Sequence, residues 1–158
     1  MTIEHSSLQF GIPEVGVVYR ARPAAFGVGE EAGRIALVRV TVEGSKPWFD
    51  LPGGAIEANE SARDAVIREF GEETGLRIEA GQVYARADQH FRLTDDSPVN
   101  NLCTFFEVRL DGVQPGLKIE DDHELVWRDP PEALRILRHD AHAWALTAWL
   151  RRRGIASG

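Results

Sequence analysis

Apolar and β-branched residues recur in short runs along the chain, and glycine, proline or small polar residues bound each run. This pattern predicts β-strands, because β-branched and aromatic side chains favour extended backbone. Glycine and clustered Asn, Asp and Ser predict the connections between them. We expect a glycine-containing hairpin loop over residues 23–33 and a turn over 94–101. The predicted strands cover residues 15–20, 35–42, 48–51, 83–93, 102–110 and 125–128.

Two stretches predict helices instead. The first runs over residues 62–73, where Ser61 and Asp64 resemble a capping box and Gly75 suits the left-handed end of a helix. The second covers residues 139–153, is rich in Ala, Trp and Leu, and is expected to close at Gly154. Strands interrupted by two helices without a regular βαβ rhythm predict an α/β fold, with a mixed sheet packed between helices.

Length and composition narrow the class of protein. The 158 residues, 43% of them hydrophobic, suit a single domain over 1–158. The 18 basic and 25 acidic residues give a net charge of -7 without a basic run, which argues against a duplex nucleic-acid partner. One cysteine, Cys103, excludes an internal disulfide and a cysteine-based zinc site. Because we find no membrane span and no signal-peptide pattern at residues 1–7, we expect a cytoplasmic location.

The first predicted helix has an unusual distribution of charge. At about 100° per residue, Val66, Ile67 and Phe70 form an apolar face that should enter the core. Glu69, Glu72 and Glu73 converge beside that face among small residues, where their carboxylates repel one another. A divalent cation would remove this repulsion, and oxygen-only ligands favour Mg²⁺ or Mn²⁺. The alternative for these three glutamates alone is a solvated acidic face.

The spacing around the glutamates favours the metal site. Residues 54–76 read as Gly, five residues, Glu, seven residues, and then Arg-Glu-apolar-any-Glu-Glu-any-Gly-apolar. This segment resembles the Nudix box. With each fixed residue used at roughly 7%, a chance match is on the order of 10⁻⁷. The matching positions are Gly54, Glu60, Arg68, Glu69, Phe70, Glu72, Glu73, Gly75 and Leu76.

The resemblance implies the Nudix fold, which is an α/β/α sandwich around a mixed β-sheet. It also implies Mg²⁺- or Mn²⁺-dependent hydrolysis of a nucleoside diphosphate linked to another group. A (d)NTP pyrophosphohydrolase that clears oxidised or non-standard nucleotides is the alternative enzyme. A non-catalytic module that only senses a nucleotide is a further alternative, although such modules typically lose box glutamates. The substrate and the residues that bind it stay unassigned.

The resemblance also implies roles for the box residues. Glu69, Glu72 and Glu73 would bind the metal, and Glu69 and Glu73 are candidate catalytic residues. Arg68 would orient a catalytic glutamate through a charge-assisted hydrogen bond. Glu60 would either assist the metal site or hold that arginine. Gly53 and Gly54 would let the backbone approach the helix closely, so that a carbonyl, which we assign to Gly54, can join the metal shell.

The resemblance also implies that a general base can come from a loop after the box. The acidic segment 120–124 precedes the last predicted strand and offers four carboxylates. Asp121, Asp122 and Glu124 are the nominees, and Glu120 is less favoured. Each could instead belong to a solvated acidic loop, in which case Glu69 is the remaining candidate for the base.

Several other side chains admit two interpretations. His90 could contact substrate or lie on the surface, and Cys103 is expected to be a buried apolar residue rather than a nucleophile. Trp144 and Trp149 should pack on the sheet, with a homodimer contact as the alternative. Four aromatic residues could stack on a base but are expected mostly to pack in the core: Trp48, Tyr84, Phe91 and Trp127.

Overall fold

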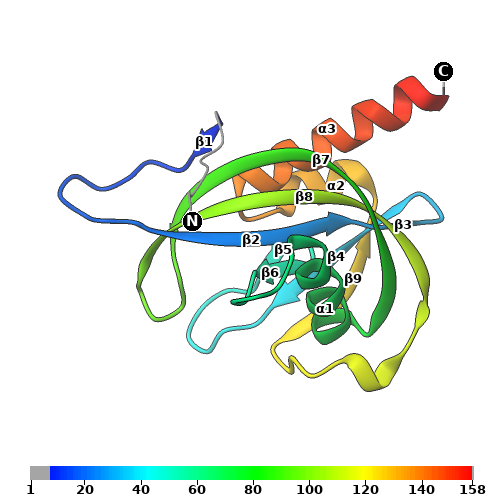
Figure 1. Ribbon diagram of the computed structural model, residues 1–158, viewed down its shortest axis with the longest axis horizontal. Coiled ribbons are helices and arrows are strands. Elements are labelled where there is room, and N and C mark those ends of the chain that lie inside the picture. The colour runs from blue at the N-terminus through cyan, green and yellow to red at the C-terminus, as the bar shows by residue number, and fades with distance from the viewer. Residues whose placement is uncertain (1–7, 158) are drawn as a thin grey trace.

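A computed structural model describes the backbone of residues 8–157 and the side chains of residues 8–154 (Figure 1). Residues 1–7, where we expected no signal peptide, lie outside the described residues. The helices are α1 (Ala62–Thr74), α2 (Pro130–Ile136) and α3 (Asp140–Ser157), and a short 3₁₀ turn covers Pro115–Leu117. The strands are β1 (Gln9–Phe10), β2 (Arg20–Val28), β3 (Glu30–Glu31), β4 (Arg34–Val40), β5 (Trp48–Asp50), β6 (Gly53–Ala55), β7 (Leu76–Arg92), β8 (Pro98–Val113) and β9 (His123–Arg128).

The strands form two sheets. The larger sheet has the order β1-β7-β8-β2-β6 and is mixed: β1 runs parallel to β7 and β2 parallel to β8, while β7 pairs antiparallel with β8 and β6 antiparallel with β2. The smaller sheet joins β3, β4, β5 and β9 through antiparallel pairs. The expected mixed sheet is therefore confirmed.

Helices cover the strands from opposite sides, with α1 on one side and α2 and α3 on the other (Figure 1). Val66 and Phe70 of α1 are fully buried against Phe106 and its neighbours, which confirms most of the predicted apolar face. Ile67 is an exception: it is 36% exposed, because it lies at the edge of that face. No helix of the described chain is both long enough and apolar enough to cross a bilayer.

The start of the chain corrects two predictions. Residues 15–19 form a loop rather than a strand, and Val15 and Val18 are exposed there. Strand β2 begins at Arg20 and occupies much of the predicted hairpin loop. Strand β2 contains small residues because there is little room between it and its neighbours. A Cβ at Gly27 would lie 2.7 Å from the side chain of Val108 and 2.9 Å from that of Phe70. Glycine here allows close packing of α1 on the sheet and does not mark a turn.

The later helices and strands differ from their predicted ranges mainly in length. Strands β7 and β8 extend beyond the predicted ranges, while β4 ends at Val40, two residues before the predicted end. The short helix α2 was missed, and its first turn contains two prolines. Helix α3 continues through Gly154 to Ser157, so the expected end at Gly154 is wrong. The ends of α1 are confirmed: the Ser61 hydroxyl accepts a hydrogen bond from the Asp64 N–H, and Gly75 has a φ of 75°.

Candidate active site

Two consecutive glycines bring β6 against α1. Gly53 has a φ of 146°, and a Cβ there would lie 2.1 Å from the Ala25 carbonyl oxygen. A Cβ at Gly54 would lie 2.9 Å from the carboxyl carbon of Glu69. A larger residue at 54 would therefore push the strand away from the helix, and one at 53 would clash with β2. The close approach expected at Gly53 and Gly54 is present.

Arg68 is the centre of a cluster of carboxylates. Its Nε and Nη2 donate to the two oxygens of Glu60 over 2.8 and 3.0 Å. Its Nη1 lies 2.9 Å from Glu69 Oε1 and 3.1 Å from Glu72 Oε2. The hydrogen bond from Arg68 lowers the pKa of Glu60. Of the two roles expected for Glu60, the structure therefore shows the one that holds the arginine.

Glu69 and Glu72 share one nitrogen of Arg68 and are largely enclosed. Their side chains are 16% and 24% exposed. Burial raises the pKa of Glu69, and the ion pair with Arg68 opposes that shift. A single guanidinium thus faces the carboxylates of Glu60, Glu69 and Glu72, which leaves an excess of negative charge in a partly enclosed space. This donor set of hard oxygens fits a divalent cation such as Mg²⁺ or Mn²⁺.

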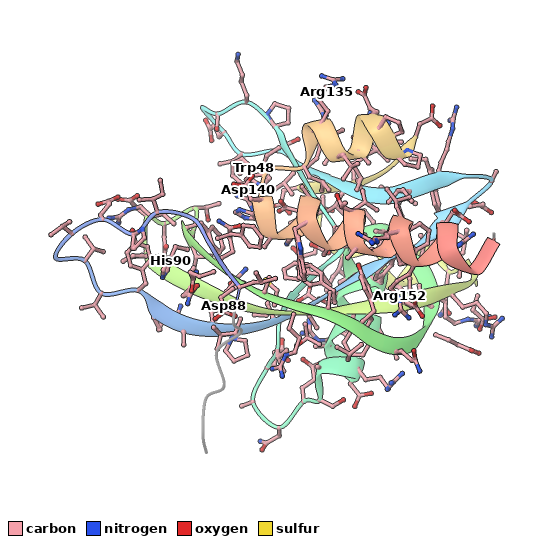
Figure 2. All side chains as sticks on the ribbon, turned by 90° about the horizontal axis from the view of Figure 1, so that it is seen from above. Trp48, Asp88, His90, Arg135, Asp140 and Arg152 are labelled. Carbon is pink, nitrogen blue, oxygen red and sulfur yellow. The ribbon has the colours of Figure 1, made fainter. Side chains whose placement is uncertain are left out.

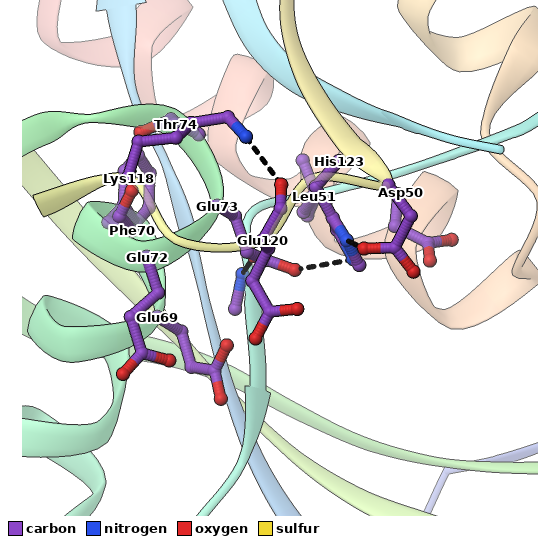
Figure 3. A network of polar contacts seen from close by, with 12 residues as sticks. Asp50, Leu51, Glu69, Phe70, Glu72, Glu73, Thr74, Lys118, Glu120 and His123 are labelled. Atoms are coloured by element: carbon purple, nitrogen blue, oxygen red, sulfur yellow. Dashed lines mark hydrogen bonds and ion pairs between the residues drawn. The ribbon is translucent and has the colours of Figure 1, made fainter. Parts of the chain in front are cut away.

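Glu73 is buried, and each of its two oxygens has one polar partner. Its Oε1 accepts the Gly53 N–H over 2.8 Å, and its Oε2 lies 2.9 Å from Nε2 of His123 (Figure 3). Burial raises the pKa of Glu73 to about 7, against the hydrogen bond from His123. Burial would lower the pKa of His123, but the carboxylates of Glu73 and Asp122 outweigh it and raise that pKa to about 9. His123 therefore acts as the cationic partner of Glu73.

The acidic segment 120–124 is fastened to the end of α1. The backbone N–H groups of Ile119 and Glu120 both donate to the Glu72 carbonyl over 3.0 Å. Lys118 also reaches the Glu120 carbonyl (Figure 3). This attachment brings the segment beside the glutamates of the helix.

The four acids of this segment occupy different places. Glu120 and Asp122 line the cavity described below, and Asp122 bonds His123 Nδ1 over 2.8 Å. Asp121 is exposed and is not part of the cavity lining. Glu124 faces Arg39, at 3.7 Å, and also lies outside the lining. Among the described residues, ligand atoms of Glu120, Asp122 and His123 lie within 4.8 Å of one another.

The sequence pattern did not predict a role for His123 in the site. Its ring reaches Glu73, which lies fifty positions earlier in the chain, so spacing alone could not pair them. The only local signal was a histidine flanked by acids just before a strand.

A cavity of about 310 Å³ opens above these carboxylates. One end contains Glu69, Glu73, Glu120, Asp122 and His123, which we call the glutamate end. The other end lies between β5, the end of β7 and the start of α3; Figure 2 labels Trp48 of β5 and Asp140, the first residue of α3. We call this second region the donor wall, and it comprises Trp48, Asp50, Phe91, Arg138, His139 and His142.

Some of the aromatic residues considered for stacking on a base line the cavity, and the others pack in the core. Trp48 and Phe91 line the cavity. Tyr84 packs on the core and donates its hydroxyl to the Ala145 carbonyl over 2.9 Å. Trp127 packs beside the buried face of α1, and Trp149 is 4% exposed in the main core.

The other single candidates do not reach the cavity. His90 stacks on Tyr19 with ring centroids 4.7 Å apart and is not among the lining residues. Cys103 is buried, and burial raises the pKa of its thiol, as expected for an unreactive cysteine. Trp144 packs near Phe10, with 6.2 Å between ring centroids.

Comparison with known sequences decides the family. Residues 18–150 match the sequence model of the NUDIX domain. The chain belongs to this family. The Nudix box and the arrangement of its glutamates around Arg68 agree with this membership.

Individual Nudix relatives match over shorter stretches. An uncharacterized Nudix hydrolase, YvcI, of Bacillus subtilis is 58% identical over 31 residues, which is 20% of each protein. An ADP-ribose pyrophosphatase of Methanocaldococcus jannaschii is 42% identical over 53 residues, covering 34% of this chain and 31% of the relative. The chain therefore matches less than a third of the length of these curated relatives.

Solved structures agree over the whole fold. A NUDIX hydrolase from Nitrosomonas europaea superposes with a TM-score of 0.71 at 18% identity, over 84% of this chain and 90% of that one. The expected Nudix fold, with helices on both sides of a mixed sheet, is thereby confirmed.

Proposed function

We propose that this Nudix chain hydrolyses a phosphoric anhydride bond in a nucleoside diphosphate derivative, with Mg²⁺ or Mn²⁺ as cofactor. The proposal is carried by Glu69 and Glu73, which line one end of a nucleotide-sized cavity, and by Glu72, which shares Arg68 with Glu69. The similarity to an ADP-ribose pyrophosphatase supports this class of substrate. The complete set of box glutamates argues against a module that only senses a nucleotide.

In this proposal the metal is held by Glu69, Glu72 and Glu73 together with the Gly54 carbonyl. When bound, a divalent ion neutralises the diphosphate, polarises phosphorus and lowers the pKa of the attacking water. Arg68 fixes the carboxyl groups of Glu69 and Glu72 through a single nitrogen. His123 and the Gly53 N–H hold Glu73 in place, so its side chain enters the site already oriented.

A carboxylate near the reacting water would accept its proton. Glu120 and Asp122 are the acids of segment 120–124 that line the cavity, so we propose that one of them is the base. Asp121 and Glu124, although nominated from sequence, lie outside that lining. If neither Glu120 nor Asp122 serves, the role passes to Glu69.

The test is hydrolysis of a panel of compounds with Mg²⁺ or Mn²⁺, followed by ³¹P NMR of the products. The panel contains ADP-ribose, nucleoside diphosphate sugars, dinucleoside polyphosphates and the nucleoside triphosphates. We expect two phosphorylated products from a nucleoside diphosphate derivative, with oxygen from H₂¹⁸O in one of them. Preferential release of pyrophosphate from a (d)NTP would favour the alternative enzyme. Folded protein with no turnover of any compound would overturn the proposal.

A further inference from the structure

Three ring nitrogens at the donor wall lack a hydrogen-bond partner. Among the described residues, the buried side-chain nitrogens without a partner include Trp48 Nε1, His139 Nε2 and His142 Nε2. The histidines are 7% and 1% exposed, respectively. Buried polar groups in native proteins are nearly always paired, so several unpaired atoms beside one cavity call for a ligand.

The chemistry of two of these nitrogens is fixed. Nδ1 of His142 accepts the Leu51 N–H over 3.2 Å, so it carries no proton of its own. Burial lowers the pKa of His142 to about 4, which keeps the ring neutral and places its proton on Nε2. The indole nitrogen of Trp48 is always a donor. Both groups therefore require a hydrogen-bond acceptor.

The acceptors nearby are already occupied. Asp50 receives Nε and Nη2 of Arg138 over 3.2 and 2.7 Å. Asn101 gives its carbonyl oxygen to Nη1 of Arg22 over 2.9 Å. Arg22, which also lines the cavity, interacts electrostatically with Glu69 and is therefore counted with the glutamate end. The cavity away from the glutamates is thus rich in N–H donors and poor in free acceptors.

The same region has flat walls. The guanidinium of Arg138 lies 4.3 Å from the centroid of Trp48 and 5.5 Å from that of Phe91. The His142 ring packs 4.4 Å from Phe26, another lining residue. Planar side chains with donors at their edges suit a planar heterocycle that carries carbonyl oxygens.

We propose that the donor wall holds the base of the substrate and selects uracil or guanine, which carry a carbonyl at pyrimidine C4 or purine C6, over cytosine and adenine, which carry an amino group at that position. This assignment rests on the proposed function, because it places the phosphates at the glutamate end and the base at the opposite end. Trp48 and His142 are the specificity-determining residues, since each offers an N–H to the carbonyl oxygen at C4 or C6, and an amino group at that position cannot accept it.

A pair of substrates tests the proposal directly. UDP-glucose and CDP-glucose share their sugar and phosphates and differ only along one edge of the base, where uracil has C4=O and N3–H and cytosine has C4–NH₂ and an unprotonated N3. We expect kcat/KM for UDP-glucose to exceed that for CDP-glucose by at least ~10-fold, because the wrong base leaves buried donors unpaired. Equal values in the wild-type protein would overturn the proposal.

Two conservative variants locate the selectivity. Trp48→Phe removes the N–H and keeps an aromatic ring, while His142→Asn keeps an acceptor for Leu51 and removes the Nε2 donor. In each variant, the ratio of kcat/KM for UDP-glucose to kcat/KM for CDP-glucose should fall toward one, because the variant loses more kcat/KM on UDP-glucose. A merely structural defect would slow both substrates equally and leave the ratio unchanged, which would contradict the proposal. Trp144→Phe, on α3 outside the cavity lining, is the matched control and should keep the wild-type ratio.

A binding measurement separates this inference from the proposed function. UMP and CMP are titrated into ¹⁵N-labelled protein, with the Trp48 indole resonance assigned through Trp48→Phe. We expect UMP to bind at least ~10-fold more tightly and to shift that resonance downfield. This result would support the subsite even if no compound were hydrolysed. Equal affinities, or no binding of either nucleotide, would overturn it.

Discussion

The two ends of the cavity are built in opposite ways. The glutamate end combines two acidic segments, the α1 glutamates of residues 54–76 and the segment 120–124, and the carboxylates of the first surround Arg68. The donor wall joins β5 to the start of α3, some ninety positions later, through the Arg138 N–H to Phe49 carbonyl bond of 2.9 Å. It concentrates N–H groups. The difference suggests a division of work, in which one end performs the reaction and the other selects what reacts.

The largest expected effect is at the glutamate end. Glu69→Gln keeps the volume of the side chain and removes a charged ligand, so kcat should fall by about 10³-fold, as for loss of one strong electrostatic stabiliser. Glu73→Gln should be similarly impaired. The free energy of unfolding of Glu69→Gln without metal should hold or rise, because burial and Glu72 both disfavour the charge of Glu69.

Glu57 provides a matched control for this substitution. Its side chain is 68% exposed and lies 3.7 Å from Arg68 without lining the cavity. Glu57→Gln should retain near wild-type kcat in the same assay. If Glu69→Gln were equally active, the assignment of the reaction to this end of the cavity would be wrong.

The segment 120–124 should show the next largest effect. Removing the base, by Glu120→Gln or Asp122→Asn, should lower kcat by about 10²-fold with a smaller change in KM. Asp121→Asn and Glu124→Gln are controls from the same segment, and both should stay near wild type. Near-normal rates in all four variants would leave Glu69 as the base.

Much of the glutamate end could be predicted from the sequence because its information is local. Ser61 and Gly75 mark the ends of α1, and the helical period places Glu69, Glu72 and Glu73 together. The ion pair between His123 and Glu73 depends on how β9 meets α1, which no spacing rule contains.

The rest of the fold was harder to predict where tertiary packing overrides local preference. Val15 and Val18 favour strands but lie in an exposed loop. Gly27, which suggests a turn, lies in β2 because α1 packs closely there. The donor wall could not be predicted from the sequence either, since Trp48 and His142 line one cavity only because the fold brings β5 beside the start of α3.

The smallest expected effect is a loss of folding stability at acid pH, which comes from His142 of the donor wall. A histidine in the unfolded chain has a pKa near 6.5, whereas burial lowers that of His142 to about 4. Between these values the unfolded state binds the extra proton, so stability is lost as the pH falls from about 6.5 toward 4. At pH 5 this loss should be on the order of 2 kcal/mol.

Urea unfolding at pH 7.5 and pH 5 measures this loss. His142→Asn has no titrating ring at that position, so the wild-type protein should lose about 2 kcal/mol more than the variant on acidification. His139, which is also buried, is present in both proteins, and its contribution therefore cancels. Identical losses would show that His142 is not held neutral in the folded protein.

Dependence of turnover on divalent metal tests the central claim most directly. The protein is treated with a chelator, exchanged into metal-free buffer, and assayed on its best substrate before and after addition of Mg²⁺ or Mn²⁺. We predict that hydrolysis falls to background and is restored by either ion, because the carboxylates around Arg68 hold the cofactor that activates water. Full turnover in the metal-free protein would contradict the account.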